Sequence, residues 1–283
     1  LNASGLPSRN TPPIPLDATR EASVEFAPYD VEYGQFTGCN INLVTKSGTN
    51  EIHGSAFAVF NNDDLTGNSI DGDVVNEESF TDWNWGAEIG GPIIEDKLFL
   101  YVAYEETDDA DVQAEGPAGA GFANEVDVTL DDVNEIQSIL ENRFGQDTGG
   151  LQRTLPETTR RIFSRLDWFI NENHRFAFTY TRVREDNTGP DDFGFEDFTF
   201  ANNFEREGSD VDIFSARLFS EWSDNLTTEI RVSRNDNDDV QGPVGGGERT
   251  GDGDFVNRIV VDTPNGSVLS GPGFFRSANE LNT

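Results

Sequence analysis

Methionine is absent from the sequence, cysteine occurs once, at Cys39, and basic residues are scarce, with 19 Lys and Arg against 53 Asp and Glu. A lone cysteine excludes an intrachain disulfide scaffold. The net charge of −34 excludes nucleic-acid binders, which carry basic footprints, and disfavours docking on anionic lipid headgroups. Because the chain begins at Leu1, without methionine or a signal peptide, we expect an internal piece of a longer protein.

Long apolar runs and catalytic motifs are also missing. No stretch approaches the roughly 18 apolar residues of a spanning helix, which excludes a helical membrane protein. No zincin, Walker A or dinucleotide-binding pattern occurs, and His53 and His174 have no spaced partner. The acidic fragments at 71–73 and 236–239 lack the residue spacing of an EF-hand. We therefore predict no catalytic residue, no metal site and no cofactor, and a protein that is not an enzyme.

Alternation of apolar and polar residues dominates the remaining sequence, and this pattern is typical of strands with two different faces. Most of the alternating segments approach the roughly 9–11 residues with which a tilted strand crosses a bilayer. We predict seven strands, at 51–60, 83–90, 97–106, 161–170, 174–183, 212–222 and 225–234.

The apolar residues of these strands fall on one face. Trp168 and Trp222 lie on it just before short turns, where an interfacial aromatic girdle is expected. A soluble sandwich also alternates, with its apolar face inside, so alternation leaves barrel and sandwich equally open. The row on which the choice depends comprises Leu166, Trp168, Phe214, Leu218 and Ile230.

The lengths of the connections favour a transmembrane barrel. Short connections, of sequence GPIIED, NEN and SD, alternate without exception with long ones at 61–81, 107–158, 186–208 and 237–283. Outer-membrane barrels have short periplasmic turns and long outer loops, whereas sandwich connections show no such strict alternation. The long connections hold 32 acidic and 6 basic residues. These acids are either solvated, as in a salt-adapted organism, or bind cations, and both readings stay open.

One long connection contains a helical pattern. Val133, Ile136, Leu140 and Phe144 follow helix spacing within Asp131–Phe144. Thr129 with Asp132 forms a candidate capping box, and the glycine after the last helical residue is a plausible stop. We predict a small loop helix that packs on the rim of the barrel.

Residues 24–57, VEFAPYDVEYGQFTGCNINLVTKSGTNEIHGSAF, differ in character from the rest. The glycines permit tight turns, INLVT suits a short strand of a small buried sheet, and SGTN signals a turn before a membrane-length strand. This segment resembles the plug-to-barrel junction of TonB-dependent outer-membrane receptors of the Oar-like group, although Cys39 stands where the family usually has glycine. Residues 90–105 and 165–176 resemble the next hairpins of that family. The junction residues are Tyr33, Gly34, Gly38, Asn42, Thr45, Lys46, Gly48 and Asn50.

The resemblance implies an all-β fold: the C-terminal part of a plug domain at 1–49, followed by the N-terminal strands of a partial transmembrane antiparallel β-barrel at 50–283. Closed barrels have even strand numbers, so seven strands place a break inside a barrel that the family implies has roughly 22 strands. The polar face then lines a lumen, where its charged residues either hydrogen-bond the plug or hydrate the lumen. These candidates are Arg161, Arg165, Asp167, Arg217, Glu221, Glu229 and Arg231.

The resemblance also implies the outer membrane of a Gram-negative bacterium and plug-gated active uptake of a large or scarce substrate. The expected partners are outer-membrane lipid, the TonB system through a preceding region, and an unidentified substrate. One alternative is a soluble acidic β adhesin or polymer-binding module at the cell surface, whose apolar faces would pack on each other. Another is a passive porin.

Overall fold

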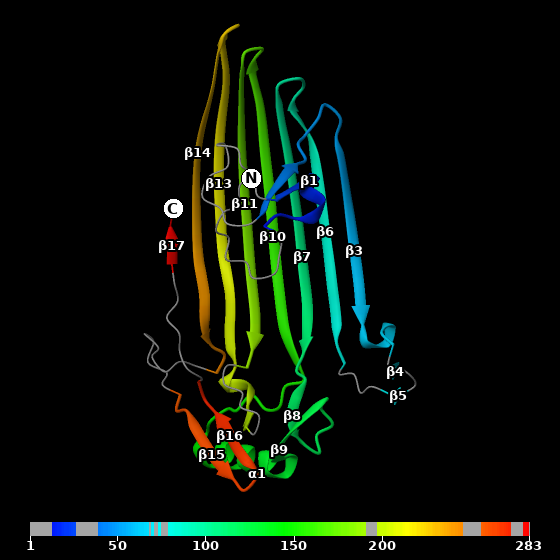
Figure 1. Ribbon diagram of the computed structural model, residues 1–283, viewed down its shortest axis with the longest axis vertical. Coiled ribbons are helices and arrows are strands. Elements are labelled where there is room, and N and C mark those ends of the chain that lie inside the picture. Colours follow the sequence, from blue (N-terminus) through cyan, green and yellow to red (C-terminus); the bar gives the residue numbers. More distant parts are fainter. Residues whose placement is uncertain are drawn as a thin grey trace.

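Seven long strands form one antiparallel sheet, here called the wall, in the computed structural model (Figure 1). The structure describes residues 13–26, 39–67, 69–70, 73–74, 79–190, 197–245, 256–272 and 280–282. The strands of the wall follow one another in chain order, and all seven predicted strands are confirmed. They are β3 (His53–Asn62), β6 (Thr81–Ile94), β7 (Leu98–Val112), β10 (Thr154–Asn171), β11 (His174–Gly189), β13 (Glu205–Ser223) and β14 (Leu226–Pro243).

The two sides of the wall end differently. β3 forms one edge, and a short strand, β17 (Glu280–Asn282), pairs with β14 at the other edge. Within the described residues the wall is therefore an open sheet and not a closed barrel. Short turns join the strands at one end, and all long connections lie at the opposite end (Figure 1).

The strands are longer than predicted, and they extend at the end that carries the long connections. β10 has 18 residues and β13 has 19, where the sequence predicted 10 and 11. Backbone pairing continues through polar residues there, because ladder hydrogen bonds do not require an apolar face. β6 also continues past its predicted end, through Pro92 to Ile94. A register shift between these two residues accommodates the proline, and the turn that follows holds Asp96 at φ 61°.

One face of the wall, the outer face, is apolar and exposed. Ile230 is 58% exposed and Trp168 44%, and no second sheet covers them in the described part of the chain. The soluble alternative needs these side chains inside a core, whereas in the described part of the chain they are exposed. Cross-strand register sets the residues in rows. One row is Leu98, Trp168, Phe176, Leu218 and Ile230, and the next is Leu100, Leu166, Phe178, Ala216 and Val232.

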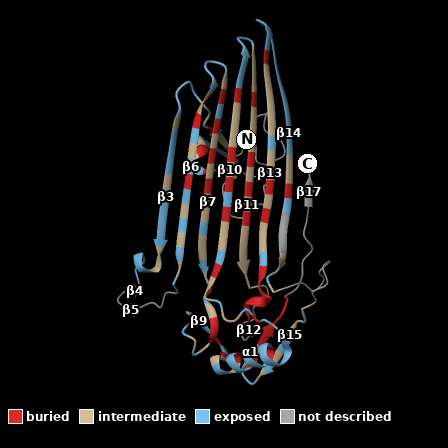
Figure 2. Cartoon of the chain, turned by 180° about the vertical axis from the view of Figure 1, so that it is seen from behind, coloured by how far each residue is buried: buried red, intermediate tan, exposed pale blue. Residues whose placement is uncertain are grey.

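The opposite, inner face of the wall carries an N-terminal hairpin (Figure 1). It consists of η1 (Leu16–Ala18), β1 (Thr19–Phe26) and β2 (Cys39–Thr45), and β1 pairs antiparallel with β2. Ala18 of η1, together with Ile14 just before it, packs on alternate residues of β7 and β10. Figure 2 marks buried positions along these two strands. This contact forms a small core of Ile14, Ala18, Tyr101, Ala103 and Phe163, with Leu43 beside it.

Three long connections fold together into a separate unit, here called the loop domain (Figures 1 and 2). One strand pair joins two connections, because β12 lies parallel to β16. The other pairs lie within single connections: β15 is antiparallel to β16, and β8 is parallel to β9. The elements are β8 (Glu115–Ala118), β9 (Asn124–Thr129), α1 (Leu130–Phe144), β12 (Asp197–Thr199), β15 (Ile259–Thr263) and β16 (Gly266–Ser270). They share one core, formed by Val126, Val128, Val133, Ile136, Leu140, Phe198, Phe200 and Val268.

Helix α1 confirms the predicted capping. Thr129 Oγ1 accepts a hydrogen bond from Asp132 N at 3.2 Å, and Gly145 ends the helix at φ 66°. The predicted packing on the barrel rim is wrong, because the apolar side of α1 is buried against β9 of its own connection and against residues of the two other connections. No helix in the described ranges is long and apolar enough to cross a membrane.

The remaining described elements are short. η2 (Asp63–Leu65), β4 (Ser69–Ile70) and β5 (Asp73–Val74) lie between β3 and β6, and η3 (Ala201–Asn203) precedes β13.

Candidate functional site on the inner face of the wall

A buried ion pair holds the start of the hairpin to the wall. Arg161 Nη1, on β10, lies 3.1 Å from Glu105 Oε1, on β7, and both side chains are less than a tenth exposed. The second oxygen, Glu105 Oε2, accepts a hydrogen bond from Leu16 N at 2.7 Å. Burial demands a partner for each charge, and here the carboxylate is shared between a guanidinium and a backbone amide of the hairpin.

Arg165 attaches the end of the hairpin. Its Nη1 donates to Thr45 Oγ1 at 2.9 Å, at the last residue of β2. The same guanidinium meets the buried carboxylate of Asp167 through two hydrogen bonds, of 2.7 and 3.0 Å. Because a bidentate pair fixes the plane of the guanidinium, Asp167 orients Arg165 toward the hairpin.

Glu88 forms a third attachment between the wall and the hairpin. Lys46 Nζ lies 2.7 Å from Glu88 Oε1, which also accepts from Ser55 Oγ at 3.1 Å. The hydroxyl of Tyr101 contacts Glu88 Oε2 and lies 3.2 Å from the carbonyl oxygen of Asp17. One carboxylate on β6 is thus linked to both ends of the hairpin.

The residues after β2 follow the backbone of the wall closely. A Cβ at Gly48 would lie 2.6 Å from Leu100 O and 2.8 Å from Gly91 O, so only glycine fits. Asn50 binds the β6–β7 turn in both directions. Its Nδ2 donates to Asp96 Oδ1 at 2.6 Å, and its Oδ1 accepts from Asp96 N at 2.8 Å.

The predicted junction residues fall into three groups: those outside the described residues, one on β2, and those that contact the wall. Tyr33, Gly34 and Gly38 lie outside the described residues. Asn42 lies on β2. The other four make the wall contacts described above: Thr45, Lys46, Gly48 and Asn50.

The predicted inner-face residues also separate into two groups. Arg161, Arg165 and Asp167 gather at the hairpin. The others lie apart on β13 and β14, where Arg231 Nη2 is 3.4 Å from Glu229 Oε1 and both side chains are nearly half exposed. This second group is Arg217, Glu221, Glu229 and Arg231.

Sequence reasoning missed three residues of this site: Glu88, Tyr101 and Glu105. Alternation could have found them, because they occupy inner-face positions of strands that were correctly predicted. Their pairing with Lys46, Asp17 and Leu16 could not be read from spacing, since the partners lie 42 to 89 residues away.

Two glutamates of the loop domain accept hydrogen bonds from uncharged groups. Hydrogen bonds from Gln137 and Thr148 keep the pKa of Glu141, on α1, below its ordinary value. Backbone amides of Gly121 and Gly119 lower the pKa of Glu125 in the same way. In the described part of the chain, no group of three or more His, Cys, Asp or Glu side chains could hold a metal ion.

Comparison with known proteins shows which proteins the chain is similar to. The family model of the outer membrane β-barrel domain matches residues 44–116, which run from the end of the hairpin through β3, β6 and β7. The TonB-dependent transporter Oar of Myxococcus xanthus is 27% identical over 182 residues, which cover 60% of this chain and 16% of that protein. The chain is TonB-dependent receptor-like.

The fold and location follow for this TonB-dependent receptor-like chain. It is a partial transmembrane antiparallel β-barrel and lies in the outer membrane of a Gram-negative bacterium. The outer face of the wall therefore contacts lipid, and the inner face lines the lumen. No solved structure matches the chain.

Proposed function

We propose that the chain forms the end of a plug and the first barrel strands of a transporter that takes up a large or scarce substrate. In this proposal residues 1–49 belong to the plug, residues 50–283 belong to the barrel, and the TonB system opens the plug. The 49/50 boundary falls in the connection between β2 and β3. Similarity to a transporter and the barrel architecture support transport and not enzymatic catalysis.

The single observation that carries the proposal is that the N-terminal hairpin is attached to the inner face of the wall. Ala18 of the hairpin and Ile14, just before it, are buried against Tyr101 and Phe163. A buried ion pair, an arginine fork and a lysine–glutamate pair fasten it at its two ends. A passive porin keeps an aqueous channel, whereas a chain segment packed on the inner face obstructs it.

The test uses the full-length protein that contains this chain, reconstituted in planar bilayers. We expect almost no conductance from the intact protein and large, steady conductance after deletion of all residues up to 49. In cells, deletion of the gene and deletion of TonB should cause growth defects on the same single nutrient sources. An intact protein that conducts as well as the deletion variant would show a passive porin, and nutrient defects unaffected by TonB would contradict energy coupling.

A further inference from the structure

The inner face of the wall carries three arginines near the end with the short turns: Arg175 on β11, Arg217 on β13 and Arg231 on β14. They are here called the arginine patch. Register places them in two neighbouring rows, next to the hairpin attachment at Asp167. The first row is Asp167, Ala177, Arg217 and Arg231, and the second, nearer the turns, is Phe169, Arg175, Phe219 and Glu229. Because short turns lie on the periplasmic side, the patch lines the periplasmic part of the lumen.

Two arginines of the patch have no carboxylate partner. Within the part of the chain that the structure describes, the side chains of Arg175 and Arg217 make no hydrogen bond and no ion pair. The guanidinium of Arg175 packs on aromatic rings instead, and its Cζ lies 4.9 Å from the ring centroid of Phe219 and 5.9 Å from that of Phe169. Such packing uses the flat face of the guanidinium, so N–H donors at its edge are left for an acceptor.

The patch also sets like charges against each other. Arg217 lies directly opposite Arg231, an arrangement that destabilises a sheet unless an anion lies between the two charges. Glu229 contacts Arg231 at 3.4 Å, and both side chains are nearly half exposed. Glu221, one row nearer the turns, is the other carboxylate at this end of β13 and β14 in the described ranges. Three guanidiniums therefore face two carboxylates, in a chain with 53 acidic and 19 basic residues.

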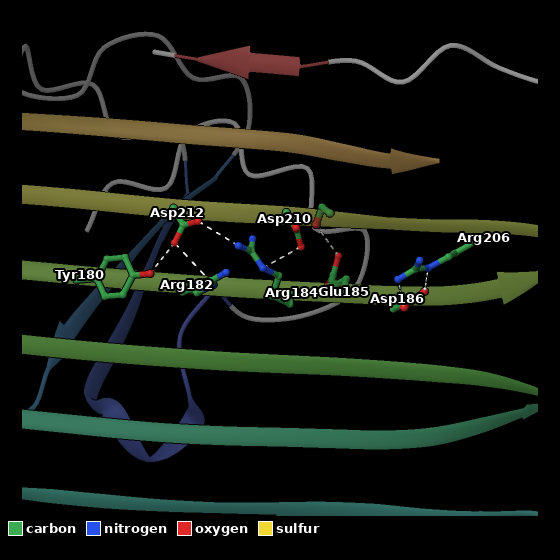
Figure 3. Close-up of polar contacts among 9 residues, drawn as sticks. Tyr180, Arg182, Arg184, Glu185, Asp186, Arg206, Asp210 and Asp212 are labelled. Carbon is green, nitrogen blue, oxygen red and sulfur yellow. Dashed lines mark hydrogen bonds and ion pairs between the residues drawn. The ribbon is translucent and has the colours of Figure 1, made fainter. Parts of the chain in front are cut away.

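Arginines farther along the same strands are paired, as Figure 3 shows. Arg184, on β11, lies 3.1 Å from Asp210 and 3.3 Å from Asp212, both on β13, and Arg206 pairs with Asp186. Carboxylates thus partner guanidiniums on the outer side of β11 and β13. The guanidiniums without partners on the inner side of the same two strands indicate an anion that the described residues do not supply.

Burial distinguishes the patch from the hairpin attachments. Arg161 and Glu105 are less than a tenth exposed, and each has a partner, as a permanent contact between charges requires. Arg231 is 45% exposed and its partner Glu229 is 44% exposed. Half-open guanidiniums suit a group that arrives and leaves. The three strands of the patch span about 10 Å, so the long arginine side chains can converge on one oxyanion group.

We propose that the arginine patch binds an oxyanion group of the transported substrate, a carboxylate, sulfate or phosphate, as the substrate leaves the lumen. The inference rests on the proposed transport function and adds that the substrate is anionic. The planar fork of arginine matches two oxygens of such a group. The net charge of −34 acts weakly at the patch, because salt screens charges farther away than about 8 Å. A carboxylate of the plug offers the same chemistry, so the test separates the two sources.

The first test measures binding of citrate to the full-length protein in dodecylmaltoside micelles, by the rise in melting temperature at constant ionic strength. R175Q/R217Q should bind citrate at least tenfold more weakly than the wild type. R160Q/R182Q is the matched control, because it removes two arginines from the outer face of β10 and β11, and it should bind like the wild type. E229Q removes the competing carboxylate and should tighten citrate binding severalfold.

Three results of this test would overturn the proposal. A wild type that does not bind citrate would show that a plug carboxylate already occupies the patch or that no anion binds there. Equal binding by R175Q/R217Q and the control would place citrate elsewhere. Weaker binding by E229Q would show that Glu229 helps to form the site and does not compete with the anion.

The second test identifies the class of substrate by growth on single nutrient sources. Deletion of the gene and deletion of TonB should impair growth on nutrients that carry carboxylate, sulfate or phosphate groups, and R175Q/R217Q should slow growth on the same nutrients. A TonB-dependent defect confined to uncharged nutrients would overturn this inference and leave the proposed function standing. Citrate binding without any TonB-dependent defect would instead contradict the proposed function, and with it the assignment of the bound anion as substrate.

Discussion

Glu105 shows how one side chain can join two parts of the chain. Its carboxylate is buried, and its two oxygens serve Arg161 on the wall and the backbone amide of Leu16 in the hairpin. A glutamine at this position keeps an acceptor for the amide but removes the charge. The guanidinium of Arg161 would then stay buried without a counterion, which is the costly way to break an ion pair.

Glu105→Gln should therefore destabilise the full-length protein by about 3 kcal/mol, measured by urea unfolding in lipid–detergent micelles. The control is Glu229→Gln, which breaks an exposed Glu–Arg pair on the same face and should cost less than about 1 kcal/mol. The double variant E105L/R161M should recover most of the loss, because no buried charge remains. Equal costs for the buried and exposed pairs would contradict this account of the hairpin attachment.

At the scale of elements, the loop domain depends on a core shared by three connections. Phe200 is fully buried between β12 and strands of the other connections, and its backbone N donates to Leu269 O at 3.0 Å. Below it, Asn202 Nδ2 donates to Asp147 O at 2.9 Å and lies 3.0 Å from Ser270 Oγ. The connections therefore support one another, and no one of them supplies a core alone.

Phe200→Ala should cost the loop domain about 3–5 kcal/mol and loosen all three connections together. Hydrogen exchange should show faster exchange in α1, β9 and β16, with unchanged protection in β10 and β11. Phe144→Ala is the control, since that ring is 70% exposed and its removal should change nothing. Faster exchange confined to β12 would show that the connections fold independently.

Strand positions and turns were predictable, while strand ends and the loop domain were not. Alternation located β10 and β11 because one face of each meets lipid. It failed at Thr154–Arg160, where β10 continues as a paired strand with polar residues on both faces. The core of the loop domain joins Val128, Phe200 and Val268, which no local period links. Likewise, alternation placed Arg161 on the inner face but did not identify Glu105 as its partner.

At the scale of the whole molecule, the wall separates three environments: lipid, the lumen, and a charged zone near the loop domain. Which of these a side chain meets depends on the face it points to and on its position along the strand. Residues of one parity face lipid, those of the other face the lumen, and the strands continue past the apolar rows into a charged zone. In β10 the seven residues from Thr154 to Arg160 lie beyond the last apolar outward residue, Ile162. At about 3.3 Å per residue they extend the wall by roughly 20 Å. The acidic loop domain lies beyond this extension (Figure 1).

Two neighbouring residues of β11 test this separation most directly. Phe178 lies in the middle of the apolar outer rows, and Thr179, the next residue, points to the inner face. An arginine on the lipid face near the bilayer midplane costs about 2–4 kcal/mol, whereas the lumen is hydrated. Phe178→Arg should therefore sharply reduce the fraction of full-length protein that assembles in the outer membrane, measured by its heat-modifiable band on gels. Thr179→Arg should assemble nearly as the wild type does, and equal defects in both variants would show that the two faces have been assigned wrongly.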